Sequence, residues 1–167
     1  KIGIISGGFD PIHSGHLAYI NEAKKNCDFL LVGVNSDDWL IRKKGRPFIS
    51  FEERIQIVKS ITGVTYATSF NDSDDSASDL IVKASKMFPL DHLIFMNGGD
   101  RNQSNIIEMR SKLISNIKVE FMFSVGGDNK INASSKILQD WKNKTVQRNW
   151  GTYRLLDKQN KWAVKEL

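Results

Sequence analysis

Two histidines lie three residues apart in a glycine-rich segment near the start of the chain, which reads Gly7-Gly8-Phe9-Asp10-Pro11-Ile12-His13-Ser14-Gly15-His16. Residues three apart share one face of a helix, so His13 and His16 would direct both imidazoles at one point. The start of a helix also offers backbone N–H groups to a phosphate, and glycines let the backbone approach it closely. The segment therefore predicts a site that stabilises negative charge on a phosphoryl group during a reaction.

A basic segment, Arg42-Lys43-Lys44-Gly45-Arg46-Pro47, supplies further cations. A mobile loop of this kind could close over a triphosphate, with Lys43, Lys44 and Arg46 acting as point charges. The alternative is a solvated basic loop that binds no ligand. The residue types alone leave both interpretations open.

Two later segments also combine the residue types that bind nucleotides. Gly98-Gly99-Asp100 follows an apolar run, and glycines there would let a base or a ribose lie against the backbone. The alternative is a tight turn that Asp100 caps. Ser134 and Ser135 begin a segment of helical spacing, where hydroxyls and backbone N–H groups predict a second phosphate site.

The hydrophobic pattern predicts a framework that brings these segments together. Apolar runs typical of buried strands alternate with segments of helical spacing, as in βαβ units around a parallel sheet. We expect strands at residues 1–6, 29–34, 64–67, 93–96 and 119–123, helices at 17–25, 51–61, 80–87, 106–114 and 134–141, and a polar connection at 35–47. The predicted fold is α/β, a Rossmann-like, doubly wound sheet of five parallel strands. Such sheets bind ligands outside the carboxyl ends of their strands, which the candidate segments follow.

The first segment resembles the signature of a nucleotidyltransferase superfamily, Gly-x-Phe-Asp-x-x-His-x-Gly-His, which this chain matches at Gly7, Phe9, Asp10, His13, Gly15 and His16. That superfamily includes glycerol-3-phosphate cytidylyltransferase and the adenylyltransferase that acts on heptose phosphates. Residues 42–47 and 50–54 are similar to the lysine-bearing loop and arginine-bearing helix of these two branches. Gly98-Gly99-Asp100 resembles an element of the heptose branch. Residues 132–137 resemble the segment that opens the final helix in these families, with Ala133 in place of a serine.

The resemblance implies transfer of CMP or AMP from CTP or ATP to a phosphorylated sugar or polyol, with release of pyrophosphate. It implies catalytic roles for His13, His16, Lys43 and Lys44. It also implies nucleotide contacts from the segments described above and from one helical arginine: Gly7, Gly8, Phe9, Asp10, Gly15, Arg46, Arg54, Gly98, Gly99, Asp100, Ser134 and Ser135.

The same resemblance leaves the nucleotide and the role of Arg54 open. Gly98-Gly99-Asp100 favours ATP, whereas the helix that carries Arg54 fits a CTP enzyme equally well. Arg54 could instead be a helix-surface residue that pairs with a neighbouring acid. We expect Mg²⁺ to arrive with the triphosphate, and we predict no metal site built from protein side chains.

Composition is that of a globular protein, with 40% hydrophobic and 26% charged residues among 167. No apolar run approaches the length needed to cross a bilayer, so no membrane association is expected. The single Cys27 has no cysteine with which to form an intramolecular disulfide, which suits a reducing compartment. We therefore expect a cytoplasmic protein.

Charge divides the chain near residue 141. Lysine and arginine balance aspartate and glutamate, 17 against 17, over residues 1–140, whereas residues 141–167 hold 7 against 2 and three of the four tryptophans. We predict a nucleotidyltransferase domain over residues 1–140 and a basic, tryptophan-rich tail over residues 141–167. The alternating pattern of the tail predicts a β-hairpin with its turn at residues 157–160. The Trp-Gly-x-Tyr pattern that begins at Trp150 resembles the opening of the cupin domain of type II mannose-6-phosphate isomerases.

The tail leaves several partners open. Its tryptophans could pack on the body, on a second subunit of a homodimer or on a following cupin-like domain. Clustered lysine, arginine and tryptophan are also typical of proteins that bind single-stranded nucleic acid. The alternative function is therefore a nucleotide-binding regulatory or nucleic-acid-binding protein, although the electrically neutral body argues against a nucleic-acid partner.

Overall fold

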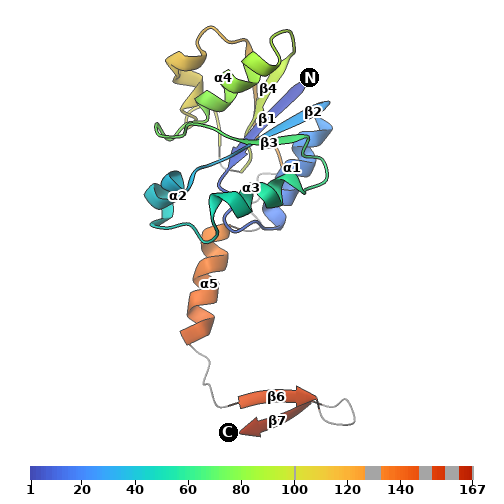
Figure 1. Ribbon diagram of the computed structural model, residues 1–167, viewed down its shortest axis with the longest axis vertical. Helices are drawn as coiled ribbons and strands as arrows, with labels where there is room; N and C mark the ends of the chain where they lie inside the picture. Colours follow the sequence, from blue (N-terminus) through green and yellow to red (C-terminus); the bar gives the residue numbers. More distant parts are fainter. Residues whose placement is uncertain (100, 127–132, 147–151, 157–161, 167) are drawn as a thin grey trace. The chain divides into compact units, whose positions relative to one another are not determined.

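The protein is described by a computed structural model over residues 1–99, 101–126, 133–146, 152–156 and 162–166. Five parallel strands form its main sheet, namely β1 (Ile2–Gly7), β2 (Phe29–Val34), β3 (Tyr66–Ser69), β4 (Leu93–Met96) and β5 (Val119–Met122). Their order across the sheet is β3-β2-β1-β4-β5 (Figure 1). The predicted doubly wound, Rossmann-like sheet of five parallel strands is confirmed.

Helices cover both faces of this sheet. On one face, Ile20 of α1 (Ser14–Lys25) and Val58 of α3 (Phe51–Lys59) pack with Ile5 and other strand residues. On the other face, α4 (Ser78–Met87) and a 3₁₀ turn, η2 (Lys112–Ile114), pack with Ile4 and its neighbours. Neighbouring residues of β1 thus face opposite cores, which explains why the strands are apolar without alternation.

The strand order locates the crevice in which a ligand would bind. β1 is flanked by β2 on one side and by β4 on the other, so the chain winds in opposite directions from this central strand. Doubly wound sheets bind ligands at that switch point, outside the carboxyl ends of the strands. The loops that follow β1 and β4 therefore border the crevice, and they hold the paired histidines and the second pair of glycines.

One predicted connection is wrong, because the segment 35–47 contains helix α2 (Asp37–Lys44). Its end signals are those of a helix: the Ser36 hydroxyl accepts a hydrogen bond from Trp39 N, acids occupy the first turn and bases the last, and Gly45 ends it at φ +86°. Only Leu40 is fully buried in this helix. The short apolar stripe hid it from an interpretation based on hydrophobic spacing.

The predicted helix at 106–114 is also wrong. Two single 3₁₀ turns occupy it, η1 (Glu108–Arg110) and η2, and Ser111 between them is extended at φ −75° and ψ 126°. The Ser111 hydroxyl accepts a hydrogen bond from Leu113 N, so this residue caps a new turn instead of continuing the first. The predicted strands at 29–34 and 93–96 have the same bounds as β2 and β4, and the remaining predicted elements occur with shifted ends.

The chain forms two compact units, Lys1–Ser134 and Ser135–Leu167. The second contains most of α5 (Ser134–Val146) and two antiparallel strands, β6 (Thr152–Leu156) and β7 (Trp162–Glu166), which form the expected hairpin pairing. The turn predicted at 157–160 and Trp150 lie outside the described residues. The domain boundary near 141, the homodimer and the cupin-like continuation stay predictions. Within the residues that the structure describes, no helix has both the length and the apolar character that a membrane span requires.

Candidate active site

The two histidines of the signature segment form a stacked pair at the start of α1. Their ring centroids are 3.9 Å apart and their planes are inclined by 25°. The Nδ1 atom of His13 accepts a hydrogen bond from Gly15 N at 3.1 Å, and the Nδ1 atom of His16 accepts one from His13 N at 3.3 Å. The two rings therefore cap the helix. The sequence analysis expected backbone N–H groups at this helix start to bind a phosphate, but the N–H groups of His13 and Gly15 already bind the imidazoles.

These hydrogen bonds fix which nitrogen of each ring carries the proton when the ring is neutral. A ring nitrogen that accepts a hydrogen bond carries no hydrogen, so each neutral imidazole bears its proton on Nε2 and can donate it to an anionic oxygen. For His16, burial, the neighbouring His13 and Lys44 together lower the pKa to about 3. His16 is thus a neutral hydrogen-bond donor at physiological pH.

Phe9 and the glycines before it shape the loop beneath the histidines. Phe9 adopts a positive φ of 50°, is buried, and lies with its ring centroid 5.1 Å from that of His16. A side chain at Gly7 would stand 3.1 Å from the Phe9 ring, and one at Gly8 would stand 3.0 Å from Leu40. The structure thus gives these three residues a packing role, and their predicted nucleotide contacts stay predictions.

The basic segment splits into residues that face the signature loop and residues that do not. The Lys44 ammonium donates a hydrogen bond to the carbonyl oxygen of Asp10 at 2.7 Å, and it acts electrostatically on His16. Burial lowers the pKa of Lys44, the Asp10 carboxylate opposes this, and Arg54 adds to it. The Lys43 ammonium instead lies 5.6 Å from the centre of the Trp39 ring. Arg46 is exposed. Of the two lysines, Lys44 is therefore the one that contacts the signature loop and acts on His16.

Arg54 is the most deeply engaged cation of the region. Its side chain is 0% exposed, and its guanidinium donates hydrogen bonds to the carbonyl oxygens of Gly8, Asn35 and Ile49 at 2.7, 2.8 and 3.3 Å. It also forms an ion pair with Asp37 at 2.6 Å. The sequence analysis offered the alternative that Arg54 lies on the helix surface and pairs with an acid. The surface position is wrong, whereas the ion pair with an acid is present. A direct nucleotide contact by Arg54 stays a prediction, and its observed role is to hold three loops together.

Three acids connect these loops, and only Asp10 was identified from the sequence. The Asp10 carboxylate is buried and accepts hydrogen bonds from Phe48 N and Ile49 N, at 2.9–3.0 Å. Asp37 accepts from Arg54 and from Phe51 N. Asp72, which follows β3, accepts from Ser36 and Asn35, at 2.7–3.0 Å. The signal that could have revealed Asp37 and Asp72 is their position shortly after an expected strand.

The loop after β4 packs on α1. A side chain at Gly98 would stand 2.9 Å from the Tyr19 ring, and the Tyr19 hydroxyl donates to Met96 O at 2.6 Å. Gly98 is thus required by a close approach of protein to protein, whereas Gly99 has open space and a φ of +66°. Nδ2 of the neighbouring Asn97 is a buried donor without an acceptor among the described residues, which native structures usually satisfy with a ligand or a water. Asp100 lies outside the described residues.

The two serines at the start of α5 differ in burial and belong to different compact units. Ser134 is buried, and its hydroxyl donates a hydrogen bond to Pro11 O of the signature loop at 2.9 Å. Ser135 is exposed and belongs to the second compact unit. The structure therefore connects Ser134 with the histidine loop, and the predicted phosphate contacts of both serines stay predictions.

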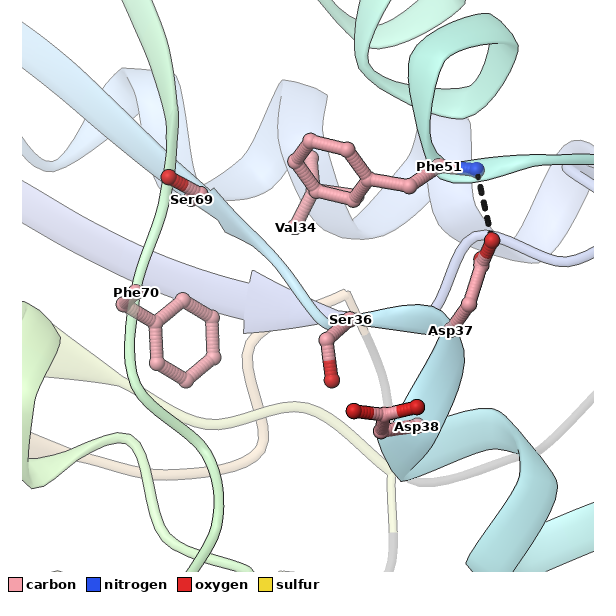
Figure 2. Close-up of a pocket in the computed structure, with 7 residues that line it drawn as sticks. All are labelled: Val34, Ser36, Asp37, Asp38, Phe51, Ser69 and Phe70. Atoms are coloured by element: carbon pink, nitrogen blue, oxygen red, sulfur yellow. Dashed lines mark hydrogen bonds between the residues drawn. The ribbon is translucent and has the colours of Figure 1, made fainter.

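A cavity of about 250 Å³ opens beside this site, at the carboxyl ends of β2 and β3. Figure 2 shows Asp37 and Asp38 at the start of α2 on one side, and Ser69 and Phe70 from the end of β3 on the other. The full lining is Val34, Ser36, Asp37, Asp38, Phe51, Ser69 and Phe70. Sequence analysis did not identify this cavity, because its lining comes from three separate segments of the chain, within residues 34–38, at 51 and at 69–70.

The sheet order, the stacked histidines at its switch point and the adjacent lysine form the arrangement that the resemblance to nucleotidyltransferases implied. The class of the chain is thus that of a nucleotidyltransferase. The family model described as cytidylyltransferase-like matches residues 4–163, and the chain belongs to the cytidylyltransferase-like family.

Curated relatives of the chain include proteins called bifunctional protein HldE. The one from Blochmanniella floridana is 36% identical over 109 residues, a match that covers 64% of this chain and 21% of the relative. The one from Haemophilus influenzae (strain PittEE) is 33% identical over 112 residues, covering 60% and 24%. The matched region thus spans only about a fifth to a quarter of these relatives.

Solved structures show the same fold. The lipopolysaccharide core biosynthesis protein from Thermoplasma volcanium GSS1 is 25% identical with a TM-score of 0.56, over 74% of this chain and 94% of that protein. A bifunctional NMN adenylyltransferase/ADP ribose pyrophosphatase from Francisella tularensis has a TM-score of 0.61 at 18% identity, over 86% and 42%. The second likeness supports the fold alone.

Proposed function

We propose that the chain transfers CMP or AMP from CTP or ATP to the phosphate of a phosphorylated sugar or polyol. An oxygen of the acceptor phosphate forms a bond to the α-phosphorus, the bond from that phosphorus to the β-phosphate oxygen breaks, and pyrophosphate leaves. The acceptor phosphate is already ionised at neutral pH, so the attack needs no general base, and in-line positioning supplies much of the rate. Nucleotidyl transfer onto a phosphate is the reaction class that the family membership supports.

The stacked histidines carry this proposal. His16 remains neutral and offers an Nε2–H donor, and the neutral form of the stacked His13 ring carries its proton on the same atom. Two such donors in a partly buried site would stabilise the charge that develops on the oxygens of the α-phosphate. Lys44 adds a positive charge beside them, and we assign to it, instead of Lys43, the contact with the triphosphate.

We also propose that Mg²⁺ binds with the nucleotide. Among the described residues, no group of three histidine, cysteine, aspartate or glutamate side chains could hold a metal ion. The buried Asp10 carboxylate already accepts two backbone N–H groups. The oxygens of the triphosphate are therefore the main ligands available, which suits the preference of Mg²⁺ for phosphate oxygen and water. When bound, the ion offsets part of the triphosphate charge.

Pyrophosphate release tests the reaction. CTP and ATP would each be combined with a panel of sugar and polyol monophosphates, and we expect turnover with at least one pair. Thermal shifts with CTP and ATP at equal concentration rank the two nucleotides, because the tighter ligand stabilises the folded state more. Absence of turnover with every pair would contradict the proposal and favour a nucleotide-binding regulatory role.

A further inference from the structure

Helix α2 carries Lys44 to the signature loop, and it is only eight residues long. A helix this short is marginal by itself in water, so contacts with other segments must set its direction. Successive residues of a helix are about 100° apart around its axis, so Arg42 and Lys44 project on roughly opposite sides of α2. Contacts on the side of Arg42 can therefore decide where the Lys44 ammonium lies.

The loop after β3 holds the start of α2 through the carboxylate of Asp72. This side chain is 4% exposed, and its Oδ2 atom accepts hydrogen bonds from Ser36 N at 2.8 Å and from Asn35 Nδ2 at 3.0 Å. Its Oδ1 atom accepts the Ser36 hydroxyl at 2.7 Å, and the same hydroxyl accepts Trp39 N as the N-cap of α2. A hydroxyl has one hydrogen, so its donation to Asp72 leaves its lone pairs for the helix. Asp72 thus orients the group that caps α2.

The same loop also holds the last turn of α2 through Arg42. The Nη2 atom of Arg42 donates to the carbonyl oxygen of Asp72 at 2.6 Å, and its Nε atom donates to the Asp75 carboxylate at 3.2 Å. Asp72 therefore contacts α2 at Ser36 and at Arg42, which lie about 9 Å apart along a helix axis at 1.5 Å per residue. Two contacts this far apart fix the direction of the helix as well as its position.

From these contacts we infer that Asp72 and Arg42 are positioning residues, which hold α2 so that the Lys44 ammonium lies beside the signature loop and meets the triphosphate. This inference rests on the proposed function, in which Lys44 contacts the triphosphate. The ion pair of Asp37 with Arg54 holds the first residue of α2 independently. Loss of Asp72 or Arg42 should therefore turn the helix without detaching it.

A double-mutant cycle tests this inference. The kcat/KM for the nucleotide would be measured at saturating acceptor for the unchanged chain, for Asp72→Ala, Arg42→Ala and Lys44→Ala, and for the two double variants that combine Lys44→Ala with each of the others. The matched control is Asp79→Ala, which removes a carboxylate that accepts Asn71 N at 2.7 Å, next to Asp72 in the same loop. Circular dichroism would establish that each variant is folded.

We expect Asp72→Ala and Arg42→Ala each to lower kcat/KM for the nucleotide by about fivefold or more, and Asp79→Ala to change it by less than about twofold. When Lys44 is already alanine, the first two substitutions should lower it by less than about twofold, because residues that act through one another are not additive. Equal losses with and without Lys44 would overturn the inference. They would show that Asp72 serves the fold alone, or that Arg42 contacts the nucleotide directly.

Arg42→Ala keeps the test decisive if Asp72→Ala does not fold, because the Arg42 side chain is 38% exposed and its loss opens no cavity in the core. Its own cycle with Lys44→Ala then supports or overturns the inference by the same criterion.

Failure of every pair of nucleotide and acceptor to release pyrophosphate would refute the proposed function instead. The positioning is then judged from the dissociation constants of CTP and ATP, measured by isothermal titration calorimetry over the same cycle. A loss of affinity that depends on Lys44 supports the inference. A loss that is independent of Lys44, or no binding of either nucleotide to the unchanged chain, overturns it.

Discussion

The signature loop and the network around Arg54 lie side by side but are held together in different ways. In the signature loop, the hydrogen bonds that set the two imidazoles join residues two and three apart in the chain. Around Arg54, the bonds join residues from 5 to 46 positions apart, from the loop after β1, the end of β2 and the turn before α3. The reactive groups are thus arranged locally, whereas their position in the sheet depends on distant segments.

The histidines and Arg54 therefore have different roles: the histidines supply the reactive groups, and Arg54 holds the loops that position them. The loss of a histidine removes donors but leaves the loops connected, because the remaining contacts of the site do not pass through the imidazoles. The loss of Arg54 removes the guanidinium donor from three carbonyl oxygens and from one oxygen of the Asp37 carboxylate. Substitutions in the two regions should therefore affect different measurements.

Arg54→Met should cause the largest change in stability. Removing the buried guanidinium leaves three carbonyl oxygens without their donor, and an unsatisfied buried group costs about 1–3 kcal/mol, so we expect the free energy of unfolding to fall by about 3 kcal/mol or more. Denaturant unfolding measures it. Lys25→Met is the control, because Lys25 pairs with Glu22 at the surface and its loss should cost about 1 kcal/mol or less. Equal losses in the two variants would show that Arg54 is not the residue that connects these loops.

His16→Ala should instead act on catalysis. Removal of one preorganised donor to a developing oxyanion typically lowers kcat by about 10²–10³-fold, and binding of the nucleotide should change far less. Stopped-flow or steady-state pyrophosphate release gives kcat, and thermal shift gives nucleotide binding. His16→Asn separates the two functions of the ring, since its side-chain oxygen can replace Nδ1 as the acceptor for His13 N. An unfolded His16→Ala together with an active His16→Asn would make this histidine structural.

The two lysines of α2 should differ in their contribution. Lys44→Ala removes an ammonium that stands with the histidines, and a charge-assisted hydrogen bond of about 1.5–3 kcal/mol corresponds to about a 10–100-fold loss in kcat/KM for the nucleotide. Lys43→Ala, whose ammonium lies over Trp39, should lose less than about threefold. A larger loss in Lys43→Ala would mean that α2 turns its other face to the nucleotide when it binds.

Acid should weaken the fold slightly through His16, and this is the smallest effect expected. The pKa of His16 is lowered from 6.5 to about 3 by burial, His13 and Lys44, so between these values the unfolded chain binds a proton that the folded chain does not. Stability is therefore fully present above pH 6.5 and is lost as pH falls toward 3, by about 1–2 kcal/mol at pH 5. Denaturant unfolding at pH 7 and pH 5 measures the loss, and His16→Asn should remove that part of it. An NMR titration that places the pKa near 6.5 would contradict the buried, neutral state.

The sequence by itself determined what depends on neighbours along the chain. Continuous apolar runs predicted the central strands β1, β2 and β4, because a strand that is covered on both faces needs apolar residues at every position. The spacing of His13 and His16 predicted their common face, since the geometry of a helical turn fixes it. The capping hydroxyl of Ser50 predicted the start of α3 for the same local reason.

Tertiary structure decided everything that depends on which segments meet. The burial of Arg54, the choice of Lys44 over Lys43 beside the histidines, and the close approach of Tyr19 to Gly98 each involve partners dozens of residues away. The cavity that contains Asp38 exists only because β2 and β3 are neighbours in the sheet. Residue type shows that a charge is present, but only the packed chain determines which charges are neutralised and which remain for a ligand, because that depends on distance and burial.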